Sequence, residues 1–327
     1  MIASGKSVFV KHMASLTYYS IMAIVSVVRC LPLTVVARLG RFFGSIAYSL
    51  DKRHRIRTQK NLKMVFGDEW SDEKLQSTAK ENFLRLGENY ACAIKAAYMT
   101  DEQLRPYVEV RGSAYLADPV GSPQLKTRVI AIGHFGNFEL YARLGKFAGF
   151  SNGATTYRAL KNPGANRVME ELRERSDLTY FERRQDVDAL KLRLREGGMA
   201  LGILSDHHAG AGGIPSDFLG HACSATPAPV VLAMRYKADL YSAVVYRTSL
   251  AHWLIDIGPQ IPLRNGKRLR AVGDVTQEVQ NLLGEAVRRD PANWFWVHNR
   301  WRPVRPKPPA SGGESADKKS SEKSAEA

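Results

Sequence analysis

The chain has 327 residues, 44% of them hydrophobic, so it can bury one large core or two small ones, and its composition excludes collagen-like, coiled-coil and wholly disordered chains. Its three cysteines are widely spaced and odd in number, which provides neither a disulfide framework nor paired metal ligands and favours a reducing compartment. The formal charge of +15 implies an acidic partner, which could be nucleic acid, an anionic membrane surface or an acidic carrier protein.

The N-terminal segment combines an apolar run with a block of basic residues. Residues 13–28 carry no charge, which is short for a membrane span of about 20 apolar residues, and no small-residue cleavage site follows them. Over residues 29–63, nine lysines and arginines stand against the single acid Asp51, an excess of +8. Anionic lipid attracts such a block by about 1 kcal/mol per residue, and the positive-inside bias places it in the cytoplasm. We therefore expect residues 1–50 to form a membrane-anchoring, amphipathic helical segment with a basic flank.

The same segment is also compatible with two alternatives. It could be a buried amphipathic helix that is followed by a solvated charged face. It could also bind nucleic acid, but the basic block adjoins an apolar segment and no recognised nucleic-acid-binding motif accompanies it. We therefore expect no nucleic-acid partner.

Beyond this segment, helical and strand patterns alternate. Ser71 is expected to cap a helix in which apolar residues recur at helical spacing as far as Ala97. Residues 108–111 are typical of a short strand, and residues 118–123 of a turn-rich loop. The apolar run 129–132 predicts a buried strand of a parallel sheet, and a helix should begin near Asn137.

The rest of the chain continues this alternation. Strands are predicted at 153–157, 199–204, 240–247 and 254–257, and helices at about 163–176, 186–196 and 272–287. Strands separated by helices predict an α/β fold, with one domain over residues 51–302 that has a central, largely parallel or mixed sheet flanked by helices. From residue 303 onward Pro, Ser, Lys, Glu and Ala dominate, so we expect a disordered tail over residues 303–327.

Candidate catalytic residues gather where the first buried strand ends. His134 follows this strand closely, and reactive groups of open α/β sheets lie beyond the carboxyl ends of the strands. If Asn137 caps the next helix, Glu139 lies in its first turn and can hold one ring nitrogen of His134, while the other nitrogen accepts a proton from an attacking hydroxyl. On spacing alone, a structural loop histidine and a glutamate that complements the helix dipole fit these residues equally well.

The run Ile-Gly-His-Phe-Gly-Asn-Phe-Glu over residues 132–139 resembles the signature of the late acyltransferases of lipid A biosynthesis, a branch of the lysophospholipid acyltransferase superfamily. In that signature a histidine is followed by four residues and an acid, which this branch has as glutamate, and the Phe-Pro-Glu-Gly block of the glycerol-phosphate branch is absent here. The similarity covers roughly residues 20–303, although Ala159 stands where the family usually has proline. Further similar segments lie at 31–32, 39–41, 53–62, 82–87, 157–163, 205–208, 218–226 and 296–302.

The resemblance implies roles for individual residues. His134 would deprotonate the acceptor hydroxyl, and Glu139 would orient the ring of His134. Arg158 would bind an acceptor phosphate or the phosphopantetheine of a carrier, because a guanidinium offers paired donors to phosphate oxygens. The remaining candidates for substrate binding are Asn137, Asp206 and Arg300. A surface salt bridge, a loop cap and core packing stay open as purely structural roles for Arg158, Asp206 and the Trp-rich ending around Arg300.

The resemblance also implies the partners. The donor would be an acyl thioester, carried by acyl carrier protein or by acyl-CoA, and the acceptor a lipid hydroxyl, foremost that of a lipid A precursor, with a lysophospholipid or another glycolipid as the alternative. No cofactor is implied. Together with the basic block, this places the reaction on the cytoplasmic face of the inner membrane, against an anionic lipid surface.

Two further classes of function can be compared with this one. A serine hydrolase of the α/β type requires a Gly-x-Ser-x-Gly elbow, which the sequence lacks. A non-catalytic, lipid-binding protein of the membrane surface would account for the basic block but has no use for a histidine and an acid at a strand end. The adjacent His207 and His208 should point apart, without a Cys or carboxylate cluster to complete a metal site, so we predict no metal.

Overall fold

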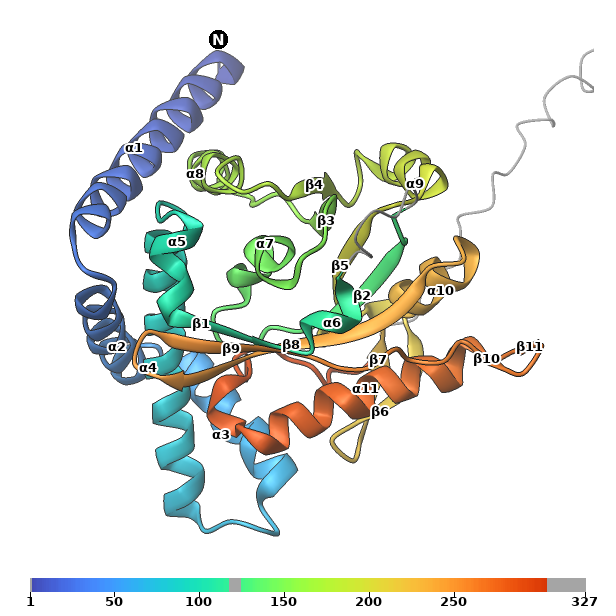
Figure 1. The fold of residues 1–327 in the computed structure, drawn as a ribbon. Helices are drawn as coiled ribbons and strands as arrows, with labels where there is room; N and C mark the ends of the chain where they lie inside the picture. The colour runs from blue at the N-terminus through green and yellow to red at the C-terminus, as the bar shows by residue number, and fades with distance from the viewer. Residues whose placement is uncertain (1, 118–124, 305–327) are drawn as a thin grey trace, which may run out of the picture.

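We describe the protein from a computed structural model, which covers residues 2–117 and 125–304 and, for residues 2–12, the backbone alone. A seven-stranded sheet occupies the centre, and helices cover both of its faces (Figure 1). The predicted α/β class with a largely parallel, mixed sheet is confirmed.

The central sheet has the strand order β1-β9-β8-β2-β5-β3-β4. Each neighbouring pair is parallel except β8 and β9, which form an antiparallel pair. Its strands are β1 (Val108–Arg111), β2 (Arg128–Ile132), β3 (Gly153–Tyr157), β4 (Thr179–Glu182), β5 (Ala200–Leu204), β8 (Asp239–Ser249) and β9 (His252–Ile257). Two smaller antiparallel pairs are β6 (Ile214–Phe218) with β7 (His221–Ala225) and β10 (Arg264–Asn265) with β11 (Arg268–Leu269).

The helices account for most of the remaining described chain. Successive helices in the N-terminal part are α1 (Ile2–Cys30), α2 (Leu33–Leu50), α3 (Lys52–Phe66), α4 (Asp72–Ala96), α5 (Asp101–Leu104), the 3-10 helix η1 (Arg105–Tyr107) and α6 (Ser113–Leu116). Those that follow β2 are η2 (Phe138–Arg143), α7 (Leu144–Ala148), α8 (Pro163–Arg173), α9 (Val187–Glu196), η3 (Gly210–Gly212), α10 (Ala228–Arg235), α11 (Val272–Arg289) and η4 (Pro291–Asn293).

The buried strand β2 divides the interior into two hydrophobic cores. Because side chains alternate along a strand, Val129 and Ala131 point to one face of the sheet, where they pack with residues of α3 and α11. Ile130 and Ile132 point to the other face, where they pack with residues of α2 and α7. All five residues of β2 are buried, as the continuous apolar run predicted.

The N-terminal helices pack tightly against the domain. Among the described residues, α1 is the one helix long and apolar enough to cross a membrane, over Met13–Cys30, and only 6% of that window is buried. Pro32 separates α1 from α2, and α2 crosses α4 so closely that a Cβ on Gly40 would lie 2.5 Å from the carbonyl oxygen of Gly87. Glycine is therefore required at this crossing, and the segment before residue 50 is continuous with the core of the domain.

Most of the predicted elements are confirmed within a few residues. Ser71 caps α4 by accepting a hydrogen bond from the backbone of Lys74. β1 and β3 have the predicted bounds, whereas the helix expected near Asn137 is the 3-10 helix η2 and receives no hydrogen bond from the Asn137 side chain. β4, β6, β7 and α10 were not predicted. The predicted loop at 118–123 lies outside the described residues, as does the predicted tail from residue 305 onward.

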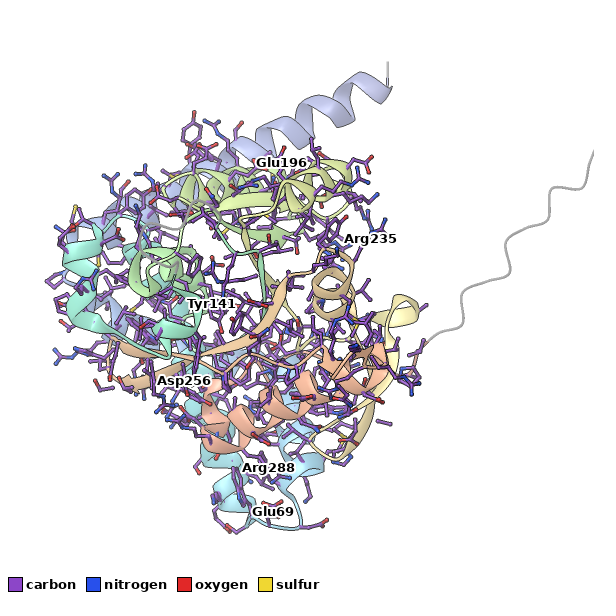
Figure 2. All side chains as sticks on the ribbon, turned by 45° about the vertical axis from the view of Figure 1, so that its right-hand side comes forward. Glu69, Tyr141, Glu196, Arg235, Asp256 and Arg288 are labelled. Carbon is purple, nitrogen blue, oxygen red and sulfur yellow. The ribbon has the colours of Figure 1, made fainter. Side chains whose placement is uncertain are left out.

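Figure 2 illustrates one polar contact inside the fold and one at its surface. Tyr141 of η2 lies inside the fold, where its hydroxyl donates to the carbonyl oxygen of Ala243 at 2.8 Å (Figure 2). Arg288 and Glu69 lie at the periphery and form an exposed ion pair between α11 and the turn after α3, with a nitrogen–oxygen distance of 3.0 Å (Figure 2). Exposed pairs of this kind contribute little to stability. The buried hydrogen bond of Tyr141, in contrast, ties η2 to β8 beside the site.

Candidate active site

The site forms where β2 and β5 end side by side. His134 follows β2, and Asp206 follows β5, the parallel neighbour of β2. The backbone N–H of Ser205 donates to the carbonyl oxygen of Ile132 at 2.8 Å, which continues the pairing beyond the last strand residues. Because parallel strands end at the same edge of a sheet, side chains that are 72 residues apart in the sequence meet here.

Asp206 holds His134 by two hydrogen bonds. Nδ1 of His134 lies 2.8 Å from one carboxylate oxygen, and the backbone N–H of His134 donates to the other at 2.8 Å. Trp294 also donates its indole N–H to that second oxygen at 2.8 Å. Asp206 is fully buried, and burial opposes its charged form, but the interactions with His134 outweigh this and hold its pKa well below the usual range.

This contact corrects two predictions. We expected Glu139 to hold His134, but the described side chains give that contact to Asp206 and show no hydrogen bond between Glu139 and His134. Glu139 does lie in the first turn of η2, as expected, but Asp206 is the carboxylate that reaches Nδ1 of His134. We also expected Asp206 to bind substrate, but its exposed fraction is 0%, so it lies beneath His134 and out of contact with a bound ligand.

Glu139 nevertheless shares a cavity with His134. Both line a small space of about 10 Å³ between α4 and η2, comparable with the volume that holds one water, and both also line the larger pocket described below. Burial raises the pKa of Glu139, against the opposing influence of Arg173 and His134. Asn137 lines the small cavity as well and is buried, with neither side-chain amide atom hydrogen-bonded within the described chain. The structure therefore brings His134, Asn137 and Glu139 together at one small cavity.

Three imidazole rings are stacked at this site. The ring of His207 lies parallel to that of His134 with centroids 3.7 Å apart, and the ring of His298 lies on the other side of His207 at 3.9 Å. Donor atoms of His134, Asp206 and His207 lie within 4.8 Å of one another. A metal–nitrogen bond lies in the plane of its imidazole, however, and two parallel planes cannot both contain one ion. The arrangement is therefore a column of rings that restricts the rotation of His134, and it does not favour a metal site.

Burial keeps the two outer histidines of the column neutral, and this predicts how stability depends on pH. Burial lowers the pKa of His207 to about 2 and that of His298 to about 4. The unfolded chain protonates both near pH 6.5, so it binds more protons than the folded state between pH 6.5 and 4, and the free energy of unfolding must fall as the pH falls. His207→Gln should reduce this slope by about 1.4 kcal/mol per pH unit. Urea unfolding in detergent from pH 4.5 to 6.5 measures it, and an unchanged slope would argue against a neutral His207.

Arg300 contacts the backbone of His207, the middle histidine of the column, and does not line the pocket. Its predicted role in substrate binding is therefore corrected. Arg300 is fully buried, and its Nη1 donates to the carbonyl oxygens of His207 at 2.9 Å and Ser224 at 2.6 Å. Its Nη2 donates to Oε1 of Gln280 on α11 at 2.6 Å. These contacts fix the loop that carries Asp206, so Arg300 positions the site through the backbone.

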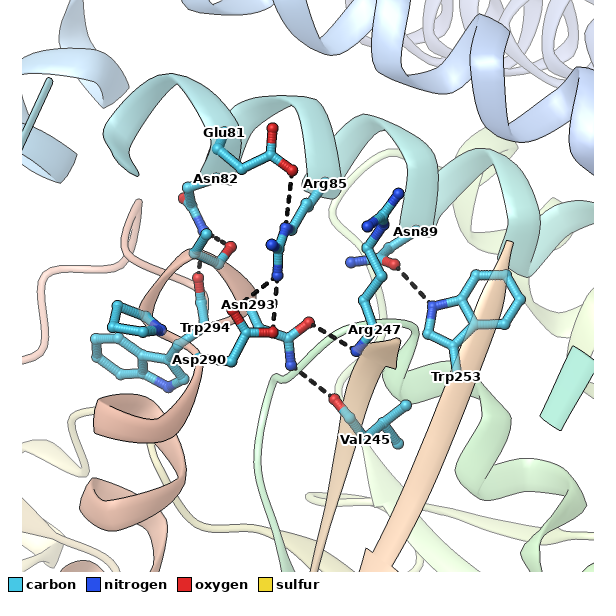
Figure 3. A network of polar contacts seen from close by, with 12 residues as sticks. Glu81, Asn82, Arg85, Asn89, Val245, Arg247, Trp253, Asp290, Asn293 and Trp294 are labelled. Atoms are coloured by element: carbon cyan, nitrogen blue, oxygen red, sulfur yellow. Dashed lines mark hydrogen bonds and ion pairs between the residues drawn. The ribbon is translucent and has the colours of Figure 1, made fainter. Parts of the chain in front are cut away.

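Side chains of α4 hold the segment that carries Trp294 (Figure 3). Asn82 donates to the carbonyl oxygen of Trp294 at 2.6 Å, and Arg85 donates to the carboxylate of Asp290 at 2.7 Å (Figure 3). Buried side-chain amides that bond backbone carbonyls fix a loop without regular secondary structure. The indole that donates to Asp206 is therefore placed by a helix more than 200 residues away in the sequence.

A large pocket opens from His134. Its volume is about 920 Å³, near the upper end of the range for small-molecule sites. Its lining includes the apolar residues Ile130, Ile132 and Leu204. The charged residues that line it are the cations Arg158, Arg173, Arg183, Lys191 and Arg302 and the acids Glu139, Glu182 and Asp186. Arg158, on the loop after β3, is exposed, and Arg173 lies over the ring of Tyr157 with its guanidinium carbon 4.4 Å from the centroid. The pocket can thus accept a long apolar chain attached to an anionic group.

The sequence was also compared with models of known protein families. Residues 5–303 match the family described as bacterial lipid A biosynthesis acyltransferase. The chain belongs to this family. No curated protein matches the chain significantly.

Membership in the lipid A biosynthesis acyltransferase family implies an acyl donor, a lipid acceptor and association with a membrane. Sequence reasoning located His134 and its pocket but missed the positioning contacts. Asp206 was selected because it follows a predicted strand, and it does lie beside His134. It was expected to bind substrate, however, whereas it holds His134. The column of His207 and His298 had no signal in the sequence, because the two residues are 91 positions apart and adopt parallel rings only through the fold.

Proposed function

We propose that this acyltransferase moves a fatty acyl group from a thioester to a hydroxyl of a lipid A precursor, with His134 as the general base. One observation carries the proposal: a histidine whose Nδ1 is held by a fully buried aspartate lines a pocket of about 920 Å³ that also has apolar lining residues. A base held in one orientation by a carboxylate is the arrangement that activates hydroxyl nucleophiles.

The chemistry requires one proton transfer in each direction. With Nδ1 bonded to Asp206, Nε2 of His134 is the atom that accepts the proton of the acceptor hydroxyl as its oxygen attacks the thioester carbonyl carbon. The tetrahedral intermediate then breaks the carbon–sulfur bond, and the thiolate leaves and takes the proton back from Nε2. The products are the ester and the free thiol, and no acyl-enzyme forms. The buried, unbonded amide of Asn137 lines the small cavity beside His134 and is proposed to donate to the developing oxyanion.

Glu139 is proposed to orient the acceptor within the pocket that it lines together with His134. Glu139→Ala should lower acyl transfer by about 10²–10⁴-fold, the range for a group that takes part in proton transfer. Glu139→Gln keeps the shape but removes the charge and should share the loss. Because burial raises the pKa of Glu139, activity that depends on its charged form should also decline earlier with falling pH than for an ordinary glutamate. Rates of purified variants across pH test this, and near-normal turnover in folded Glu139→Ala would refute the role.

Arg158 is proposed to bind a phosphate of the acceptor or of the donor. Arg158→Lys should raise the apparent KM several-fold with little change in kcat, because an ammonium cannot reproduce the paired donors of a guanidinium. Arg264→Lys, which changes an exposed arginine of β10, serves as a matched control. Initial rates against donor and acceptor concentration assign the phosphate, and unchanged constants for both substrates would exclude Arg158 from the site.

Acyl carrier protein is proposed as the donor, with the cytoplasmic face of the inner membrane as the location. Carrier proteins are strongly acidic, and the excess of +8 over residues 29–63 favours their encounter with this chain as well as anionic lipid. Acyl-CoA needs mainly a local phosphate site, so its use should depend less on ionic strength.

A competition assay tests donor and acceptor together. Purified protein is given a lipid A precursor and a lysophospholipid in equal amounts with either thioester, and products are identified by mass spectrometry at several salt concentrations. We expect the lipid A precursor to gain one acyl chain, with carrier-dependent turnover falling steeply as salt rises. Acylation of the lysophospholipid alone, or equal use of both donors at every ionic strength, would contradict the proposal.

A further inference from the structure

The apolar helix α1 contacts the catalytic domain, although most of its surface is exposed. Its main partner there is α8. A Cβ on Gly164 of α8 would lie 2.1 Å from the carbonyl oxygen of Ala14, so the backbones touch directly. The hydroxyl of Tyr18 donates to the carboxylate of Glu171 at 3.0 Å, and the guanidinium of Arg167 lies 4.1 Å from the centre of the Tyr18 ring.

The two sides of α1 differ in exposure. Ala14, Tyr18, Ile21 and Val25 recur at helical spacing and are partly or fully buried against the domain. The opposite side is apolar and open, with large exposed fractions for Met13 (47%), Leu16 (62%), Ile24 (61%) and Val27 (62%). One face of the helix therefore belongs to the protein, and the other has no partner within the described chain.

This packing does not fit a helix that crosses the bilayer. With Cys30 at the cytoplasmic end, Tyr18 and Ala14 would lie about 18 and 24 Å along the helix axis, deep in the hydrocarbon region. α8 would have to follow them, and each of its charged residues Arg167 and Glu171 would cost about 2.5–3.5 kcal/mol there. The contact with α8 therefore disfavours a transmembrane orientation of α1.

The neighbouring helix α2 presents a second exposed apolar face. One side of α2 packs on α4 through Gly40 and Gly44. The other side carries large apolar residues at positions i, i+3, i+4, i+7 and i+11, which is the spacing of a continuous helical stripe. These residues are Leu39, Phe42, Phe43, Ile46 and Leu50, with exposed fractions from 38% to 78%. The basic helix α3 follows directly, so cations adjoin the apolar stripe.

We infer that α1 and α2 form an in-plane platform that binds the surface of an anionic bilayer without crossing it. Apolar side chains on one face of a helix, with cations beside them, are the features of helices that lie in the membrane interface. The open faces of α1 and α2 enter the boundary between head groups and acyl chains, and the cations of α3 contact the anionic head groups. The occupant of this surface is the lipid bilayer itself.

The inference rests on the proposed function and adds the route of the acceptor. α8 connects the platform to the site, since it contacts α1 through Gly164 and Glu171 and ends at Arg173, which lines the large pocket. The pocket is therefore joined through one helix to the surface that holds the lipid. A lipid acceptor can reach His134 from the leaflet along α8 without being extracted into water.

Crosslinking in native membranes tests the orientation of α1. The side chains of Thr17 on α1 and Asn162 before α8 lie 3.5 Å apart, whereas Ser15 points away from the domain. Thr17→Cys and Asn162→Cys, in a Cys30→Ser background, should be joined by a short thiol crosslinker in intact membranes. The matched pair Ser15→Cys and Asn162→Cys should not. Lack of a crosslink for Thr17 in an active, membrane-bound enzyme would overturn the inference and leave the acyl transfer intact.

A second measurement examines α2 independently. Phe42→Asp combined with Phe43→Asp should shift the protein from the membrane fraction to the supernatant on extraction with alkaline carbonate, since an in-plane platform loses much of its apolar contact. Leu192→Asp, which changes an equally exposed residue on α9, should not. Full retention of the double variant would indicate a spanning anchor and overturn the inference. Release from the membrane, with acyl transfer retained in detergent, would support the inference. In the crosslinking experiment, a crosslink in a folded protein that shows no acyl transfer would count against the proposed function but not against the orientation of α1.

Discussion

His134→Ala should lower acyl transfer by about 10²–10⁴-fold while the fold is retained. His134 lines the large pocket and its ring is held by a buried carboxylate, so its Nε2 is the atom best placed to accept the hydroxyl proton. The side chain is largely covered, with 15% exposed, but removal of one ring leaves the backbone bond from His134 to Asp206 in place. Rates of lipid acylation by purified protein measure the loss.

The control for this variant is His54→Ala, which removes a surface histidine of α3 that lies 2.6 Å from Asp51. It should keep nearly full activity. Circular dichroism and thermal unfolding establish that both variants are folded. Turnover close to that of the wild type in folded His134→Ala would rule out His134 as the base and would favour a non-catalytic, lipid-binding protein.

Asp206→Asn should lower kcat by about 10⁴-fold, the loss that follows the same change in a Ser-His-Asp triad. The amide that replaces the carboxylate can turn its N–H toward Nδ1 of His134, because the other side-chain oxygen still accepts from Trp294. His134 would then carry its proton on Nε2 and could not act as the base. The variant keeps the shape of the site, so substrate affinity should change little.

Double variants separate this role from a general loss of structure. Residues that act as one unit are not additive, so His134→Ala combined with Asp206→Asn should be little slower than His134→Ala alone. Asp188→Asn changes an exposed carboxylate that pairs with Lys191 on α9 and should be neutral. Independent, multiplicative losses in the double variant would show that Asp206 acts elsewhere than through His134.

The sheet could be predicted from the sequence because its strands carry strong local patterns. The apolar run around Ile130 and the helix capped by Ser71 are determined by residues close in the sequence, and both are found as expected. β4 and the β6–β7 hairpin were missed because they are short and only partly buried, so neither a continuous apolar run nor a clear alternation marks them. Their positions depend on neighbours that the fold supplies.

The catalytic pair shows the same division. His134 could be located because the end of β2 is a local feature, but its partner is set by the pairing of β2 with β5. Glu139 was favoured by the family resemblance and by its expected place in the first turn of a helix. It does lie in the first turn of η2, but the described side chains show no hydrogen bond between it and His134. Arg300 was likewise assigned to the pocket because its segment resembles the ending of the family's sequence, whereas its guanidinium donates to the carbonyl oxygen of His207 and to the side chain of Gln280.

The most direct measurement follows thiol release and lipid acylation in the same reaction. Purified enzyme is mixed with acyl carrier thioester, with and without the lipid A precursor, and both products are quantified over a single turnover. Direct attack by the lipid hydroxyl through His134 predicts that thiol and acylated lipid appear at equal rates and in equal amounts. It also predicts that neither appears without the acceptor or with His134→Ala. Thiol release in the absence of acceptor, with the acyl group recovered on the protein or as free fatty acid, would contradict direct transfer.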